Sequence, residues 1–252
     1  MDYDTPLFFH VMQYAADADR DVIDLVSGGP DWEPPTALRE GLREFADAEP
    51  AAFQYPPSDG LRALREEIAA RRDVDADRVI VTNGAGEANY LAMAGALERD
   101  AGNEIILTDP VYPYYPGKAQ MLGADVSLVP VAEDGGLDVA AMREAASAET
   151  AAILVNSPNN PTGAVYDADT MAAVADLAAE HDAVLISDEV YDHYDFSGRF
   201  ESALSVDGDH AVVTNSFSKS MAVTGLRVGY GIFPPELAEA ARTRHMLVNV
   251  AS

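Results

Sequence analysis

Short, continuously apolar runs alternate with amphipathic helical stretches along most of the chain, and this alternation limits the possible folds more than any other feature. Most of the runs lack the in–out alternation of half-exposed strands, as expected where both faces of a parallel sheet are covered. Repeated strand–helix–strand order predicts a wound α/β sheet. The seven candidate strands are 78–82, 104–108, 125–130, 151–155, 183–187, 211–214 and 228–233. The helical stretches between them include 87–99, 138–146 and 171–181.

The two ends of the chain differ from this central pattern. Residues 35–47 and 60–72 read as two helices before the first strand, and the first thirty residues as an arm with a loop at its end. At the other end, a helix is expected over 236–250 with an apolar stripe and no Gly or Pro stop. That pattern fits either a continuation beyond residue 252 or a frayed terminal helix.

The charge balance excludes several classes of function. The chain holds 43 acidic and 16 basic residues, for a formal net charge of −27. A nucleic-acid-binding protein needs a cationic face, and anionic lipid repels such a chain, so neither partner is expected. With 48% hydrophobic residues the chain has enough material for a core, and an acidic, lysine-poor surface is typical of proteins that stay soluble in high salt. No basic leader or long apolar segment is seen, which predicts a cytoplasmic protein.

Metal and thiol chemistry are not expected. The sequence has no cysteine, which removes disulfides, thiolate nucleophiles and cysteine-based zinc sites. Its five histidines are widely separated, and most are expected at the surface or at helix ends.

Chemistry should be sought just after the strands, because ligands of wound sheets bind beyond the carboxyl ends of the strands. The first strand is followed by Asn83-Gly-Ala-Gly86, whose small residues could bring backbone N–H groups close to an anion. The fifth is followed by Asp188, a buried acid that needs a cationic partner. Lys219 follows the sixth, and the chain has only one other lysine, Lys118. Arginine cannot replace lysine where the amine must lose its proton and attack a carbonyl group.

Seven motifs occur in a fixed order along the chain. They are Ser27-Gly-Gly-Pro-Asp31, Tyr55-x4-Gly60, Asn83-Gly-Ala85, Asp109-Pro-x-Tyr112, Asn159-Asn-Pro-Thr-Gly163, Asp188-Glu-x-Tyr191 and Ser216-x-Ser-Lys219-x7-Arg227-x-Gly229. In this set and order the sequence resembles the class I/II aminotransferases, pyridoxal 5′-phosphate (PLP) enzymes of fold type I in the aspartate aminotransferase superfamily. The resemblance covers residues 20–245.

The resemblance implies a three-layer α/β/α fold around a seven-stranded, mainly parallel sheet. It divides the chain into an N-terminal arm (1–27), a PLP-binding large domain (28–235) and the start of an interdomain helix (236–252). In the family this helix leads to a small C-terminal domain, whose arginine clamps the substrate α-carboxylate and which this sequence lacks. A fragment, a protein completed by a second polypeptide and a nonfunctional remnant all fit that absence.

The resemblance also assigns roles at the cofactor ring. Lys219 would hold PLP as a Schiff base and then serve as general base and acid at the substrate Cα. Asp188 would pair with the ring nitrogen and keep it protonated. Tyr191 and Asn160 would hydrogen-bond the phenolic oxygen of the ring, and Tyr112 would stack on the ring face.

The remaining roles concern the phosphate, the substrate and the partner subunit. Tyr55 would reach the phosphate of the neighbouring subunit, so a homodimer is expected, and Gly28 would meet the substrate carboxylate through its backbone. The phosphate would be held by Gly84, Ala85, Ser216, Ser218 and Arg227.

Other readings remain open at this point. Ser216-x-x-Lys219 also fits the Ser-x-x-Lys motif of penicillin-binding serine acylases, although neither a Ser-Asp-Asn nor a Lys-Thr-Gly partner is present. The family resemblance also covers carbon–sulfur lyases, synthases of cyclic amino acids and decarboxylases of fold type I. An inactive fragment or a non-catalytic aminotransferase-like domain is a further alternative.

Overall fold

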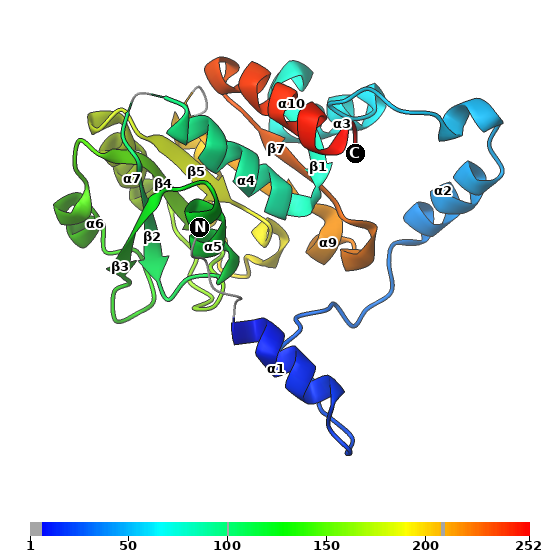
Figure 1. Cartoon of the computed structure of the whole chain (residues 1–252), viewed down its shortest axis with the longest axis horizontal. Helices are drawn as coiled ribbons and strands as arrows, with labels where there is room; N and C mark the ends of the chain where they lie inside the picture. Colours follow the sequence, from blue (N-terminus) through cyan, green and yellow to red (C-terminus); the bar gives the residue numbers. More distant parts are fainter. Residues whose placement is uncertain (1–6, 100, 208–209) are drawn as a thin grey trace.

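A single sheet of seven strands forms the centre of the computed structural model, which describes residues 7–99, 101–207 and 210–252 (Figure 1). The spatial order of the strands is β1-β7-β6-β5-β4-β2-β3. Their bounds are β1 Val79–Asn83, β2 Glu104–Asp109, β3 Asp125–Pro130, β4 Thr150–Asn156, β5 Val184–Asp188, β6 Val212–Ser216 and β7 Val228–Ile232. All seven predicted strands are confirmed, with ends that agree to within two residues.

The sheet is mixed but mainly parallel, as predicted. Strands β3, β2, β4, β5 and β6 pair in parallel, and β7 is antiparallel to both β6 and β1. Strand β1 therefore runs in the same direction as β6. As a result, the carboxyl ends of β1, β4, β5 and β6 and the start of β7 all lie at one edge of the sheet, which is where the motifs converge.

Helices cover both faces of the sheet and give the predicted three layers (Figure 1). In β4, Ile153 and Val155 face one buried cluster while Ala152 and Leu154 face the other, which explains why the run is continuously apolar. On the first face lie α3 Arg62–Arg72, α6 Val139–Ala145, α7 Ala168–Glu180 and α8 Ala203–Asp207. On the second lie α4 Gly84–Leu97, α5 Tyr114–Met121 and α10 Pro235–Asn249.

Helix α4 begins earlier than the sequence indicated. The expected start was residue 87, whereas the helix includes Gly84, so the Gly-rich motif is its first turn rather than a preceding loop. The Glu87 side chain accepts a hydrogen bond from the Asn83 backbone N–H at 2.7 Å, which stabilises this early start. The short α9, Phe217–Ser220, likewise begins directly after β6.

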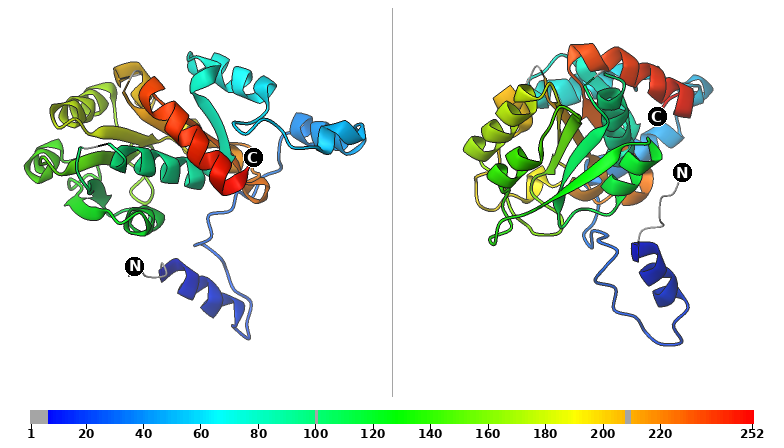
Figure 2. Two further views of the ribbon diagram at one scale, coloured as in Figure 1. Left: turned by 45° about the horizontal axis from the view of Figure 1, so that its top comes forward. Right: turned by 60° about the vertical axis from the view of Figure 1, so that its left-hand side comes forward.

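The N-terminal segments extend away from the sheet (Figures 1 and 2). Helix α2, Thr36–Ala46, matches its prediction, whereas α1, Leu7–Ala16, was not predicted within the expected arm. Neither helix has a buried residue. Residues 1–6 of that arm lie outside the described part of the chain.

Short 3-10 turns connect several elements, namely η1 Pro50–Phe53, η2 Ala76–Arg78, η3 Asp192–Tyr194 and η4 Thr224–Leu226. Among the described residues, no helix is both long enough and apolar enough to cross a bilayer. The same residues contain no group of three or more His, Cys, Asp or Glu arranged to hold a metal ion.

Candidate active site

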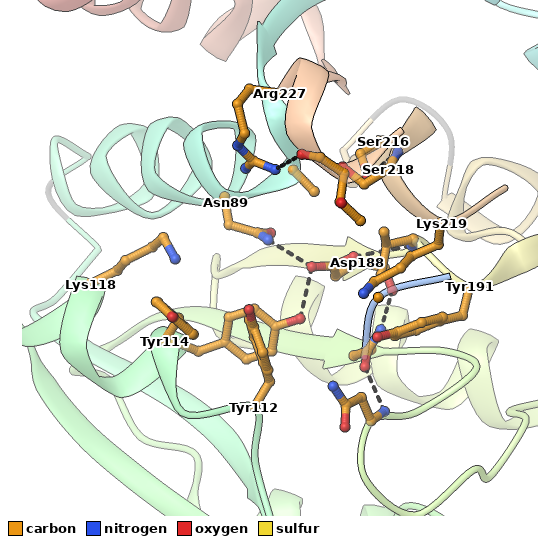
Figure 3. A pocket seen from close by; sticks show the side chains of 18 of the residues that line it. Asn89, Tyr112, Tyr114, Lys118, Asp188, Tyr191, Ser216, Ser218, Lys219 and Arg227 are labelled. Atoms are coloured by element: carbon orange, nitrogen blue, oxygen red, sulfur yellow. Dashed lines mark hydrogen bonds between the residues drawn. The ribbon is translucent and has the colours of Figure 1, made fainter. Parts of the chain in front are cut away.

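A cavity of about 640 Å³ opens at the edge of the sheet where the parallel strands end (Figure 3). The ends of β4, β5 and β6 contribute to its wall, and so do α4, α5 and the loop before β7. Nine of the twelve residues singled out in the sequence line it. These are Ala85, Tyr112, Asn160, Asp188, Tyr191, Ser216, Ser218, Lys219 and Arg227.

Close packing of backbone and guanidinium groups forms one end of the cavity. Gly84 has φ +71°, and a Cβ atom there would lie 2.5 Å from Nη2 of Arg227. A Cβ on Gly229 would lie 2.6 Å from the backbone nitrogen of Ala85. Both positions therefore require glycine, and together they bring Arg227 against the N-terminus of α4. Unpaired N–H groups and a guanidinium at one point are suited to binding phosphate.

Two serines border the same end of the cavity. The Ser216 hydroxyl accepts a hydrogen bond from the backbone N–H of Ser218 at 3.3 Å, and this contact begins α9. Both residues are buried and both line the cavity. The Arg227 guanidinium donates to the Thr224 carbonyl oxygen at 2.9 Å, which holds it in place beside Gly84.

Asp188 lies at the floor of the cavity, where it is 3% exposed. Its Oδ2 accepts hydrogen bonds from Asn89 Nδ2 and from the Tyr115 hydroxyl, each at 2.7 Å. Burial raises the pKa of Asp188, and these two hydrogen bonds act in the opposite direction. No described cation forms an ion pair with Asp188, and its donors are neutral, so the cationic partner expected for this acid is not a side chain among the described residues.

Lys219 lines the same cavity as Asp188 (Figure 3). Its Nζ donates a hydrogen bond to the carbonyl oxygen of Gly28 at 2.6 Å. Burial lowers the pKa of Lys219, and the positive charge of Arg227 lowers it further. A lysine of lowered pKa more readily supplies the neutral amine that attacks a carbonyl group.

Aromatic side chains line the wall between α5 and β5. Tyr112 stacks on Tyr114 with ring centroids 5.0 Å apart, and it meets Tyr115 edge-on at 5.3 Å. Burial raises the pKa of Tyr112 to about 12 and raises that of Tyr191, so both hydroxyls remain protonated near neutral pH. The side chain of Asn160 contacts Tyr191, and its backbone N–H donates to Oδ1 of Asn156 at 2.8 Å.

Three predicted residues do not line this cavity. Gly84 is buried directly behind Arg227, and Gly28 borders a neighbouring groove while its carbonyl holds Lys219. Tyr55 is 86% exposed and does not line the cavity of its own chain.

Three further cavity residues were not found from the sequence, namely Asn89, Tyr115 and Lys118. Lys118 lies one helical turn after Tyr115 on α5. Together with Lys219, it places both lysines of the chain in the wall of the same cavity. Its Nζ lies 5.2 Å from the centre of the Tyr114 ring. Burial lowers the pKa of Lys118 to about 8, against the opposing effect of Asp188. The scarcity of lysine was the one available signal for this residue.

Comparison with known proteins gives consistent matches to one family. The family described as "Aminotransferase class I and II" matches residues 20–252. The "Aspartate/prephenate aminotransferase" of Thermus thermophilus is 36% identical over 228 residues, which cover 87% of this chain and 58% of the relative. The "Probable aspartate aminotransferase" of Methanocaldococcus jannaschii is 32% identical over 226 residues, or 87% of this chain and 59% of the relative.

Solved structures show the same similarity in three dimensions. The aspartate aminotransferase of Thermus thermophilus with maleate superposes with a TM-score of 0.87 at 31% identity, over 97% of this chain and 64% of that one. N-Succinyldiaminopimelate aminotransferase from Mycobacterium tuberculosis gives a TM-score of 0.90 at 32% identity, over 99% and 66%. The chain thus spans about 60% of the length of the curated relatives it matches.

Proposed function

The chain belongs to aminotransferase class I and II, a family of PLP-dependent enzymes, and we propose that its cavity binds PLP for transfer of an amino group between an L-amino acid and a 2-oxo acid. Residues 28–235 would form the PLP-binding domain. The observation that carries the proposal is the arrangement of Lys219, Asp188 and Arg227 around one cavity, each suited to a different part of PLP.

The residues present fit this cofactor at three points. The glycine-lined cradle at Gly84 and Arg227 suits the phosphate, because a Cβ at Gly84 would fill the space that the guanidinium occupies. Asp188 is a buried acid surrounded by neutral donors, so a protonated ring nitrogen would supply the missing cation. Lys219 offers an amine of lowered pKa to the aldehyde.

PLP, when bound, supplies an electron sink that makes the Cα proton of an attached amino acid acidic. The Lys219 amine would bind the aldehyde covalently and later accept and return the Cα proton. Asp188 would hold the ring nitrogen protonated, and Tyr191 with Asn160 would hydrogen-bond the phenolic oxygen. Tyr112 would pack on the ring and exclude water from that face.

The assembly and setting of the protein are part of the same proposal. The exposure of Tyr55 is compatible with a homodimer in which this side chain reaches the partner's phosphate site. Gly28 would meet the substrate carboxylate. The named relatives act on aspartate, prephenate or N-succinyldiaminopimelate, which makes dicarboxylic amino acids the first compounds to test. We also infer a cytoplasmic, salt-tolerant protein from the net charge of −27.

A single-turnover experiment tests the proposed reaction. PLP-loaded protein is mixed with L-aspartate, L-glutamate or an aromatic amino acid, and both products are then quantified by chromatography. Transamination predicts equal amounts of pyridoxamine 5′-phosphate and the 2-oxo acid, and none from the Lys219→Arg variant. Release of carbon dioxide or ammonia with PLP unchanged would instead indicate a decarboxylase or lyase and contradict the proposal.

A further inference from the structure

A carboxylate lies beside the phosphate cradle, in the first turn of α4. It belongs to Glu87, whose side chain is 9% exposed. Its Oε2 accepts the backbone N–H of Asn83 at 2.7 Å, which brings the carboxylate to the residue that directly precedes Gly84. The carboxylate and any phosphate held at Gly84 and Ala85 would therefore share the same end of the helix.

This placement creates an electrostatic conflict. The N-terminus of a helix favours one anion through its partial positive charge, but a carboxylate there repels a second anion such as a phosphate dianion. The Glu87 side chain is itself largely buried, so solvent screens its charge only weakly. A binding site for phosphate at this position needs a charge that compensates Glu87.

Helix α10 supplies the compensating group. Nδ1 of His245 lies 2.6 Å from Oε1 of Glu87, and Asn249 Nδ2 donates to the same oxygen at 2.6 Å. His245 is completely buried, in contrast to the surface position expected for most histidines. Its Nε2 faces the Ser252 hydroxyl at 3.4 Å. Helix α10 packs along α4, which brings together residues 158 positions apart (Figure 1).

No other described cation pairs with Glu87. The neighbouring Arg244 on α10 turns to Glu98 and to the Tyr90 hydroxyl, on the far part of α4. Arg227 lies beside Gly84, where its guanidinium donates to Thr224. Within residues 7–99, 101–207 and 210–252, His245 is thus the group placed to neutralise this carboxylate.

We propose that His245, through its contact with Glu87, is a positioning residue that offsets the carboxylate charge and so allows the α4 N-terminus to hold the phosphate of PLP. This inference rests on the proposed function for the identity of the ligand. It assigns a cofactor-related role to α10, an element that contributes no residue to the wall of the cavity.

A charge-rescue cycle with two probes tests the inference. In His245→Asn, the amide can donate in place of Nδ1 but is never charged, so the dissociation constant of PLP should rise roughly five- to twentyfold. Glu87→Gln added to that variant should restore the wild-type value. Pyridoxal, which lacks the phosphate, should bind all three proteins with the same affinity. Both constants are measured by absorbance titration of the full chain.

Several outcomes would overturn the inference. Equal PLP affinity in His245→Asn and wild type would show that the charge does not matter, and an equal loss for pyridoxal would indicate a merely structural effect. If His245→Asn does not fold, Glu87→Gln alone decides, since it removes the negative charge beside the phosphate cradle and should tighten PLP several-fold without changing pyridoxal binding. No tightening would contradict the inference.

The outcome for the proposed function is separate. Wild-type protein that binds no PLP at all would contradict the proposed function. In that case inorganic phosphate becomes the probe, and the melting temperature is measured with and without it. Phosphate should stabilise the wild type and the double variant by similar amounts and His245→Asn by less. That pattern would support the role of His245, and equal stabilisation would overturn it.

Discussion

The Tyr115 hydroxyl donates a 2.7 Å hydrogen bond to Oδ2 of Asp188 and thereby joins α5 to the end of β5. Asn89 on α4 donates to the same oxygen, and its own side-chain oxygen accepts the Thr214 hydroxyl of β6 at 2.8 Å. The orientation of Asp188 is therefore fixed from three elements before any ligand enters. All of these groups are buried, which makes each missing donor costly.

Tyr115→Phe should destabilise the protein by about 1–3 kcal/mol at pH 7, because it leaves the Asp188 carboxylate short of a donor. Burial already raises the pKa of Asp188, and loss of the hydroxyl raises it further. The cost should shrink as the pH falls and Asp188 becomes protonated, since a neutral acid needs the donor less. Urea unfolding at several pH values measures this dependence.

Tyr114→Phe is the matched control for that experiment. Tyr114 lies next to Tyr115 on the same helix, and its hydroxyl makes no hydrogen bond with a described residue. Its loss should change stability by less than about 0.5 kcal/mol at every pH. A cost for Tyr115→Phe no larger than this, or one independent of pH, would refute the role given to the hydrogen bond.

Gly84→Ala should weaken PLP binding by at least about tenfold, since the new Cβ would displace the Arg227 guanidinium and φ +71° strains any L-residue. The control is Gly95→Ala on the same helix, away from the cavity. A Cβ on Gly95 would meet only Leu237 Cδ2 at 3.7 Å, an ordinary contact, and its φ is not positive, so this change should leave binding intact and slightly favour the helix. Similar PLP dissociation constants for the two variants would show that the cradle does not hold the phosphate.

Arg72→Met should destabilise the protein by about 3–5 kcal/mol, because it leaves Glu189 buried without a counter-ion. Glu189 is completely buried, and burial raises its pKa while Arg72 lowers it. The control is Arg71→Met, which breaks the exposed 2.8 Å pair with Glu67 and should cost less than about 1 kcal/mol. Equal losses of thermal stability in the two variants would contradict the role of Arg72 as the counter-ion of the buried Glu189.

Lys118→Met should stabilise the protein at pH 7 by about 1–3 kcal/mol, because burial lowers the pKa of Lys118 from 10.5 to about 8. Below pH 8 both the folded and the unfolded chain carry this proton, so the cost of burying the charge is fully present. Between pH 8 and 10.5 the folded chain releases the proton first, and the cost is relieved as the pH rises. The gain from Lys118→Met should therefore vanish near pH 10.5, and a gain that is constant with pH would exclude this explanation.

The sheet and most of the cavity could be predicted from the sequence because both depend on local patterns. A strand buried on both faces is continuously apolar, and Asp188 and Lys219 each follow such a strand directly. Asn89, Tyr115 and Lys118 lie on helices, and whether they face the cavity depends on the rotation of α4 and α5 over the sheet, which no local pattern specifies. The pairing of Glu87 with His245 was equally hidden, since it depends on how α10 returns to α4.

The rule that a buried acid needs a cationic partner does not by itself say where the partner of Asp188 comes from. Among the described residues, three neutral donors contact the carboxylate: Asn89, Tyr115 and the backbone of Val190. The protein thereby leaves the carboxylate open for a charged ligand. Only the three-dimensional placement of Asn89 and Tyr115 distinguishes these two solutions.

Covalent labelling of lysine tests the central claim most directly, because the chain has two lysines and both line the cavity. The folded protein is incubated with PLP, reduced with borohydride, digested and mapped by mass spectrometry. The proposal predicts one label, on Lys219, that is lost in Lys219→Arg and kept in Lys118→Arg. A label on Lys118, or no label on folded protein, would contradict it.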